Sequence, residues 1–178
     1  MTHASFTVHP SPVGDVLLVT TDEGLVTAHV LHGAGDDGDL FAQLAQLTRT
    51  LRTVPGRDDD DARDAAQQLD EYFAGTRRTF EIPLDWRLVD GFARDALQAA
   101  CEIPYARTAG YGEVAAMAGR DRAARAVGNA CAHSPFSIIV PVHRVVHADG
   151  SIGGYGGRTD VKRFLLDHER ETERAAGE

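Results

Sequence analysis

Cysteine is scarce in this chain of 178 residues, which contains only Cys101 and Cys131. Two cysteines are too few for the disulfide scaffold of a small secreted protein, and they fit a reducing cytoplasm. No apolar stretch approaches the length of a membrane span, and the first residues lack a basic start followed by an apolar run. We therefore expect a cytoplasmic protein that makes no membrane contact.

Basic charge is scarce in the first half of the chain. Residues 1–85 hold 15 acidic and 6 basic side chains, whereas residues 86–166 hold 10 basic and 7 acidic ones, within a net charge of −9. The negative net charge argues against indiscriminate nucleic-acid binding. A polyanion would bind the middle of the second half, where basic residues are in excess. The acidic first half, with its aspartate run at 58–61, is explained by solubility alone.

The pattern of apolar residues divides the chain near residue 86. Residues 4–31 predict three short strands with alternating apolar positions. Apolar residues at helical spacing predict a helix over 39–52, and a second helix follows the aspartate run and extends to Phe73. Residues 77–86 predict a last strand. We predict an α+β protein whose residues 1–86 form a small N-terminal mixed α/β domain.

The second part of the chain, residues 87–178, is predicted to be mainly helical. Helices are expected after Asp90, from Tyr111 to Gly119, after Asp121 and after Asp160, and a short strand is expected at 138–140. The second and third of these helices are separated only by a three-residue turn. That spacing is typical of a helix-turn-helix.

One histidine is placed for chemistry. Residues 138–140 are apolar, and Pro141, His143 and Arg144 follow them before a glycine-rich loop. A histidine base needs an orienting partner, and Glu169 in the last helix is the candidate. A nucleophile is missing, because both cysteines lie inside alanine-rich helices where inert burial is expected. No Gly-x-Ser-x-Gly elbow is present either, which disfavours a hydrolase.

A metal site is not predicted. His29 and His32 are three residues apart, and a strand with a period of two would place them on opposite faces. No cysteine or tight carboxylate cluster lies near them in sequence, so the ligand set is incomplete.

Arg125 lies in the middle of a predicted helix, in the segment "AARAVG". Its small neighbours would let the backbone approach a partner closely. Such an arginine is suited to enter a DNA minor groove and fill the gap left by an extruded base.

Six segments in order resemble the alkylguanine-DNA alkyltransferases, also called methylated-DNA–protein-cysteine methyltransferases. They are spread through residues 92–170, and "LDEYFAGTRRTFEIPLD" extends the likeness more loosely into the first half. The resemblance implies a ribonuclease-H-like N-terminal domain, a winged helix-turn-helix DNA-binding domain and no cofactor. The segments are "IPY" at 103–105, "YGEVAAMAG" at 111–119, "RAARAVGNA" at 122–130, "IIVPVHRVV" at 138–146, "GGYGG" at 153–157 and "LLDHE" at 165–169.

The resemblance also implies roles for single residues. Arg125 matches the arginine finger that replaces a flipped base, and Tyr111 matches the tyrosine that rotates the target phosphate and later protonates the base. His143 matches a water-linked base, and Glu169 matches the carboxylate behind it. The remaining positions are the DNA-facing Ala124 and Gly128 and the pocket residues Val145, Tyr155 and Gly156.

The chain departs from the family pattern at the decisive position. The family motif is Pro-Cys-His-Arg, and here Val142 stands where the nucleophilic cysteine is expected. Valine can neither ionise nor accept an alkyl group, so covalent transfer at this position is impossible. Ser134 replaces the usual asparagine that shapes the turn beside the nucleophile, and Leu97 replaces a tryptophan found in many bacterial relatives.

Three functions remain open at this point. The first is that of the alkyltransferase-like proteins, which bind alkylated guanine in double-stranded DNA without repairing it and hand the lesion to nucleotide excision repair. We expect such a protein to act as a monomer. The second is an alkyltransferase whose cysteine has been substituted in this chain. The third is a repurposed fold that binds a ligand or protein, which the retention of Arg125 and Tyr111 disfavours.

Overall fold

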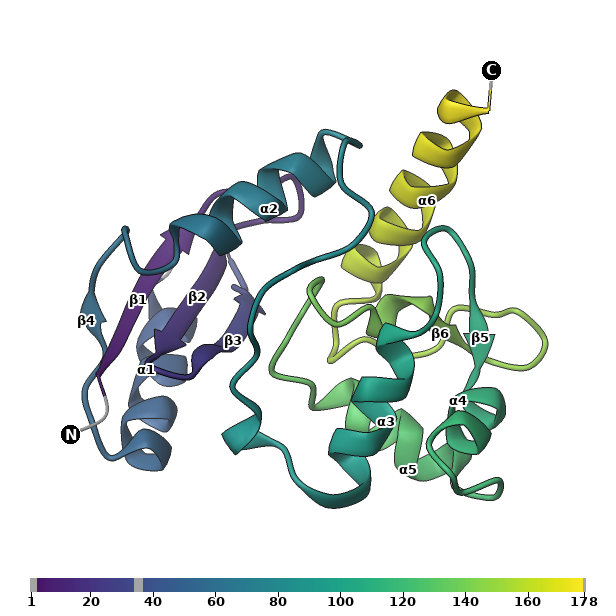
Figure 1. The fold of residues 1–178 in the computed structure, drawn as a ribbon, viewed down its shortest axis with the longest axis horizontal. Coiled ribbons are helices and arrows are strands. Elements are labelled where there is room, and N and C mark those ends of the chain that lie inside the picture. Colours follow the sequence, from purple (N-terminus) through teal and green to yellow (C-terminus); the bar gives the residue numbers. More distant parts are fainter. Residues whose placement is uncertain (1–2, 34–36, 178) are drawn as a thin grey trace. The chain divides into compact units, whose positions relative to one another are not determined.

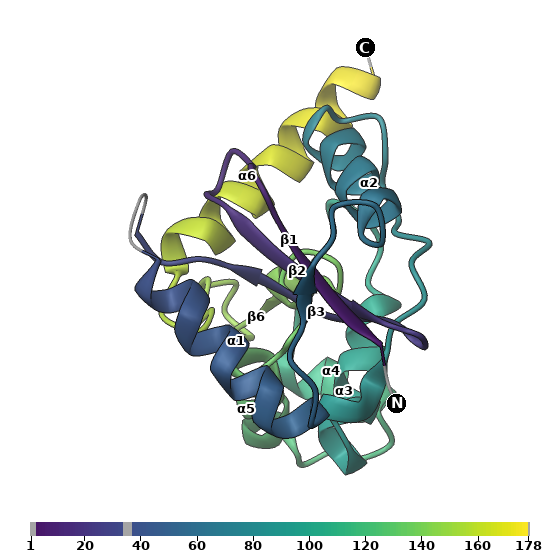
Figure 2. The ribbon, with the colours of Figure 1, turned by 90° about the vertical axis from the view of Figure 1, so that its left-hand side faces the viewer.

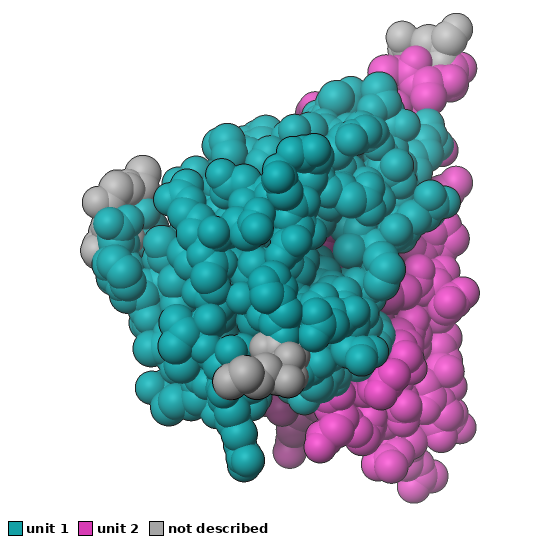
Figure 3. Space-filling view, turned by 60° about the vertical axis from the view of Figure 1, so that its left-hand side comes forward, with its two compact units in different colours: residues 1–88 teal, residues 89–178 magenta. Residues whose placement is uncertain are grey.

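Four strands form the sheet of the first unit in the computed structural model, which describes residues 3–33 and 37–177. Strands β1 (Ala4–His9), β2 (Val16–Thr21) and β3 (Gly24–Val30) form an antiparallel meander (Figure 1). The short strand β4 (Gly56–Arg57) joins the free edge of β1 in parallel, giving the order β3-β2-β1-β4. The sheet belongs to the unit Met1–Leu88, and Val89–Glu178 form the second unit (Figure 3).

The alternation of side chains along β1 explains how two helices cover the sheet. Helix α1 (Gly38–Leu51) packs on the face that carries Ala4, with Phe6 and Val8 beside it. Helix α2 (Arg63–Phe73) and the loop before it lie on the opposite face (Figure 2). There the polar side chains of β1 meet carboxylates: Ser5 donates to Asp61 (2.6 Å), Thr7 donates to Asp59 (2.5 Å), and His9 contacts Asp70 (2.7 Å). The aspartate run is therefore a hydrogen-bonding partner of the sheet, beyond its effect on solubility.

Two expectations for the first unit are wrong. Residues 77–86 form no strand and make only an isolated bridge between Leu84 and Leu25, because Pro83 has no N–H to donate to a ladder. His29 and His32 do not lie on opposite faces, because β3 ends at Val30 and the chain then turns. Their ring centroids are 5.9 Å apart.

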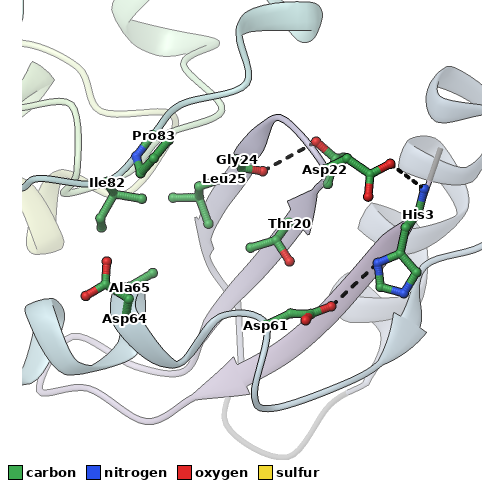
Figure 4. A pocket seen from close by; sticks show the side chains of 11 residues that line it. His3, Thr20, Asp22, Gly24, Leu25, Asp61, Asp64, Ala65, Ile82 and Pro83 are labelled. Atoms are coloured by element: carbon green, nitrogen blue, oxygen red, sulfur yellow. Dashed lines mark hydrogen bonds and ion pairs between the residues drawn. The ribbon is translucent and has the colours of Figure 1, made fainter.

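A pocket of about 320 Å³ lies in this unit between the β2–β3 turn, the start of α2 and the segment Ile82–Pro83 (Figure 4). Its polar wall is acidic, with Asp22, Asp61 and Asp64 around it. The backbone N–H of His3 donates a hydrogen bond to the carboxylate of Asp22 (3.1 Å), and this bond joins two of the residues that line the pocket.

The second unit packs its helices around a small two-stranded sheet. Helix α3 contacts both α4 and α5, and α6 contacts the 3₁₀ turn η2. Strands β5 and β6 pair in parallel. The elements are α3 (Gly91–Cys101), β5 (Ala109–Gly110), α4 (Tyr111–Met117), α5 (Ala124–Ala132), η2 (Val142–Arg144), β6 (Val145–Val146) and α6 (Thr159–Ala176).

Two local expectations for the second unit also need correction. Helix α5 begins at Ala124, later than the expected start after Asp121. Residues 138–140 form turns, because Ile138 adopts φ 70°, which an extended strand does not allow. Along α6, Val161 and Leu165 are buried, whereas Phe164 is 40% exposed. Within the described part of the chain, every helix is too short or too polar to cross a membrane.

We predict that Gly24→Ala destabilises the first unit by roughly 1–3 kcal/mol, the usual cost of a strained backbone position. Gly24 has φ +130°, and a Cβ atom built there would lie 2.3 Å from the carbonyl oxygen of Pro83. Gly56→Ala is the matched control, since a Cβ atom at Gly56 would meet nothing within 4 Å. Urea denaturation of both variants measures the difference, and equal stabilities would contradict the prediction.

Candidate functional site

A largely apolar cavity of about 610 Å³ opens beside helices α4 and α5 of the second unit. It brings together four of the residues expected to contact DNA, namely Tyr111, Ala124, Arg125 and Gly128. Volumes of a few hundred Å³ are typical of small-molecule sites, so the cavity is large enough for a nucleobase. The other lining residues are Gly112, Ala132, His147, Ala148 and Gly154.

Tyr111 is held on one wall of this cavity by close neighbours. It is the first residue of α4, and its ring centroid lies 5.3 Å from that of His147. A Cβ atom at Gly153 would lie 2.5 Å from the tyrosine hydroxyl, and one at Gly128 would lie 3.7 Å from the ring. Only glycine at 153 therefore lets the loop pass over Tyr111. Burial raises the pKa of the phenol, with a smaller contribution from Cys131, so the hydroxyl keeps its proton at neutral pH.

Arg125 stands at the exposed end of the same cavity. It is the second residue of α5, and the apolar face of that helix is buried through Val127 and Ala130. Within the described residues its guanidinium forms no hydrogen bond or ion pair, and its side chain is exposed. The group is therefore available to a partner.

A buried carboxylate lies at the centre of a second cluster. Glu169 Oε1 is 2.7 Å from His143 Nε2, and both side chains are fully buried. Arg144 donates to the same carboxylate through Nε (3.0 Å) and Nη2 (2.9 Å), and through Nη1 to the carbonyl of Ile103 (2.8 Å). The backbone N–H of Ala106 donates to Glu169 Oε2 (3.0 Å).

Electrostatics fix the charges of this cluster. Burial raises the pKa of Glu169, but the hydrogen bonds and charges of His143 and Arg144 outweigh it and lower the pKa to about 2. Burial also lowers the pKa of His143, against the opposing effect of Glu169. The result is a carboxylate paired with the guanidinium, and a neutral imidazole.

The neutral imidazole has a defined polarity. Nε2 donates its proton to Glu169, so Nδ1 carries a lone pair. Nδ1 has no hydrogen-bond partner in the part of the chain that the structure describes, although it is buried. An unpaired buried acceptor is costly, and this atom is the one that could receive a proton.

Val142 precedes His143 at the start of the 3₁₀ turn and is only 3% exposed. Its side chain is a hydrocarbon, and its backbone N–H donates to the carbonyl of Val140 (2.7 Å). Ser134 stabilises the turn that follows it, because its Oγ accepts a hydrogen bond from the backbone N–H of Phe136 (3.2 Å).

Of the expected pocket residues, Tyr155 and Val145 are buried, whereas Gly156 is exposed. Tyr155 is buried, its hydroxyl accepts a hydrogen bond from the N–H of Ile138 (3.4 Å), and burial raises its pKa to about 12. Gly156 has φ 54°, and a Cβ atom there would lie 3.4 Å from the carbonyl oxygen of Ala132. Val145 is buried in β6.

Sequence reasoning missed Lys162, the only lysine in the chain. It is fully buried, and its Nζ donates to the carbonyls of Val145 (2.6 Å) and Gly154 (3.3 Å). Burial lowers its pKa to about 8. The lysine connects the glycine-rich loop to α6 through these hydrogen bonds. The signal in the sequence that could have pointed to Lys162 is that it is the one lysine among many arginines.

The structure thus separates the expected site residues into two groups. Tyr111, Ala124, Arg125 and Gly128 line the cavity. The residues that line it include neither the buried His143–Glu169 pair nor Val142, which lie in the core of the same unit.

Together these features define a two-unit protein with a sheet-and-helix domain and a helical domain in which an exposed arginine lines a cavity large enough for a nucleobase. Residues 5–86 match the family model of the 6-O-methylguanine DNA methyltransferase ribonuclease-like domain. Residues 91–171 match the model of the 6-O-methylguanine DNA methyltransferase DNA-binding domain. The chain belongs to the 6-O-methylguanine DNA methyltransferase family.

Individual relatives match over nearly the whole chain. The methylated-DNA–protein-cysteine methyltransferase of Methanosarcina barkeri is 36% identical over 88% of this chain and 90% of its own. The constitutive enzyme of that name from Bacillus subtilis is 34% identical over 93% and 94%. The crystal structure of Mycobacterium tuberculosis OGT in complex with DNA superposes with a TM-score of 0.76 at 34% identity, covering 96% of this chain and 94% of that one.

We predict that Glu169→Gln lowers the free energy of unfolding by about 3–5 kcal/mol, because it leaves the buried Arg144 charge without a counterion. Asp167→Asn is the matched control on the same helix, since Asp167 is exposed and lies 3.5 Å from Arg170. Its effect should stay within about 1 kcal/mol. Similar losses of unfolding free energy in the two variants would show that the buried cluster contributes no more stability than an exposed ion pair.

The same pair of variants gives a pH signature. The pKa of Glu169 is about 2 in the folded chain against an ordinary value of 4.5. The unfolded chain therefore binds the extra proton between these values, and the stability that Glu169 contributes is complete above pH 4.5 and is lost as the pH falls towards 2. The stability difference between wild type and Glu169→Gln should shrink over that range. A constant difference would contradict the assignment.

Proposed function

We propose that the chain recognises alkylated guanine in double-stranded DNA and does not take up the alkyl group. The observation that carries this proposal is Val142, a buried hydrocarbon side chain at the position of the family's nucleophile, next to a complete His143–Glu169 pair. The parts suited to DNA recognition are present, and the atom that would react is absent.

DNA binding is assigned to the second unit. The family model that matches residues 91–171 is that of a DNA-binding domain. Basic residues outnumber acidic ones over 86–166, so the field of this segment favours a polyanion. Helices α4 and α5 contact each other and act as a helix-turn-helix in which α5 enters the minor groove.

Base flipping is assigned to Arg125 and the cavity beside it. The unpartnered guanidinium fills the stack that the extruded guanine leaves, while the small residues Ala124 and Gly128 allow the helix to lie close to the DNA. The flipped base enters the cavity against Tyr111, whose hydroxyl remains protonated and can donate to the base.

Alkyl transfer fails for a chemical reason. The reaction requires a thiolate that attacks the alkyl carbon while the carbon–oxygen bond to guanine breaks. Nδ1 of His143 is an acceptor suited to take the proton of such a thiol through water, but the valine side chain offers nothing to deprotonate. The bound lesion therefore persists, and this monomeric, cytoplasmic protein presents it to nucleotide excision repair proteins.

The intact buried pair favours one second candidate, an alkyltransferase whose nucleophilic cysteine has been substituted in this chain. The two candidates share DNA recognition and differ in what a cysteine at position 142 restores. A cysteine there would directly precede the histidine whose Nδ1 can accept a proton.

We predict that Arg125→Ala weakens binding to a duplex with one alkylated guanine by about tenfold or more, because a stacking contact is worth ~1–3 kcal/mol. Arg125→Lys keeps the charge and should recover only a small part of the loss. Arg170→Ala, in an exposed ion pair of α6, is the control and should change affinity little. Fluorescence anisotropy with matched modified and unmodified duplexes measures all three. Equal losses for Arg125→Ala and Arg170→Ala would reduce the interaction to generic electrostatics.

We also predict that the wild-type chain gains no methyl group from a duplex containing methylated guanine. Intact-mass spectrometry of the protein after incubation with that duplex measures the gain. Val142→Cys should gain one methyl group, more slowly than an active relative, because small misplacement of a reacting group costs on the order of a hundredfold in rate. Adding Ser134→Asn should raise that rate. A methyl adduct on Cys101 or Cys131 of the wild type would refute the non-catalytic proposal. If the variant that carries both Val142→Cys and Ser134→Asn binds DNA but gains no methyl group, the pocket differs from that of an active enzyme by more than these two residues.

A further inference from the structure

Three metal-ligating side chains converge in the first unit, whereas the residues assigned to DNA belong to the second unit. His29 lies near the end of β3, His32 follows that strand, and Asp39 lies in the first turn of α1. The ligand atoms of these residues all lie within 4.8 Å of one another. Within the described residues they are the one group of this kind with three members.

We propose that His29, His32 and Asp39 bind a divalent first-row transition-metal ion, with Zn²⁺ as the representative. Two imidazoles and one carboxylate are a ligand set that zinc accepts, with a fourth position left for water. His32 has a half-exposed side chain, so an ion can enter from solvent and keep an open coordination position there.

The spacing of the donor atoms carries this proposal. His29 Nε2 lies 3.1 Å and His32 Nδ1 lies 3.0 Å from the same oxygen, Oδ2 of Asp39. Donors bound to one tetrahedral zinc ion at roughly 2.0–2.1 Å lie about 3.3 Å apart. Two of the three donor separations are therefore close to those of a coordination shell, and the third, between the two imidazole nitrogens, lies within 4.8 Å. Rotation of the side chains would admit an ion between the three atoms.

The surroundings of Asp39 suit a metal ligand. Burial raises the pKa of its carboxyl, but hydrogen bonds from His32, His29 and Gln43 hold the pKa well below the usual range, so the group is an anion. Gln43 donates to the other oxygen, Oδ1 (3.3 Å), and the N–H of His32 donates to Oδ2 (2.9 Å). Such outer contacts orient a ligand and strengthen metal binding.

Metal binding would change the protonation pattern of both imidazoles. Without an ion, His29 donates from Nε2 and His32 donates from Nδ1 to Asp39. An ion takes the lone pairs of these same nitrogens, so each ring moves its proton to its other nitrogen, His29 to Nδ1 and His32 to Nε2. The ion would then join the end of β3 to the start of α1 and stabilise the first unit.

The test is titration of the full chain, freed of metal by a chelator, with Co²⁺ followed by its visible absorption and then with Zn²⁺ in competition. We expect one saturable site. His29→Gln, His32→Gln and Asp39→Asn should each lose more than the roughly 10–100-fold that removing an outer-shell partner costs. His9→Gln is the matched control, because His9 and Asp70 form a single histidine–aspartate pair (2.7 Å) without a second imidazole. No saturable binding in the wild type, or an equal loss in His9→Gln, would overturn the proposal.

A second measurement uses the wild-type chain alone and does not depend on how the variants fold. Imidazole ¹⁵N–¹H spectra with and without Zn²⁺ report which ring nitrogen carries the proton. The proposal expects the proton of His29 to move from Nε2 to Nδ1 and that of His32 to move from Nδ1 to Nε2, with His9 unchanged. If both rings keep their metal-free tautomers at saturating Zn²⁺, the proposal is wrong, and Asp39 only accepts hydrogen bonds from His29 and His32.

Discussion

The carboxylate of Glu169 is the interaction on which the second unit depends. It lies on α6 and accepts hydrogen bonds from His143 and Arg144 of the 3₁₀ turn and from the backbone of Ala106. One buried anion thus connects three segments that are far apart in sequence. Since the anion is paired with a guanidinium and fully hydrogen-bonded, its burial is tolerated, whereas the loss of Arg144 would leave an uncompensated charge in the core.

This network also holds backbone conformations that would otherwise be unfavourable. Ala106 has φ 57° and Ile138 has φ 70°, and left-handed backbone costs a residue other than glycine about 1–2 kcal/mol. The N–H of Ala106 donates to Glu169, and the N–H of Ile138 donates to the hydroxyl of Tyr155. The turn that carries position 142 is therefore fixed from both sides by buried polar groups.

The sequence allowed the two-part α+β architecture to be predicted, because alternating strands and amphipathic helices have local signatures. It also identified Tyr111 and Arg125, which meet at one cavity, through motifs with fixed spacing. It failed where tertiary contacts override local pattern. The apolar run 138–140 resembles a strand and is a buried turn, and His29 and His32 converge because the strand ends between them. Lys162 carries no pattern of its own, since its partners are backbone carbonyls.

The Glu169 network has a structural role that does not depend on catalysis. A chain that lost its nucleophile would still need Glu169, His143 and Arg144 to fold, so their retention does not by itself indicate catalysis. Arg125 is different, because it is exposed and its guanidinium forms no hydrogen bond or ion pair within the described residues. It lines a cavity large enough for a nucleobase, so it is available to an external partner. The proposed lesion recognition therefore rests on Arg125, and the proposed lack of alkyl transfer rests on Val142.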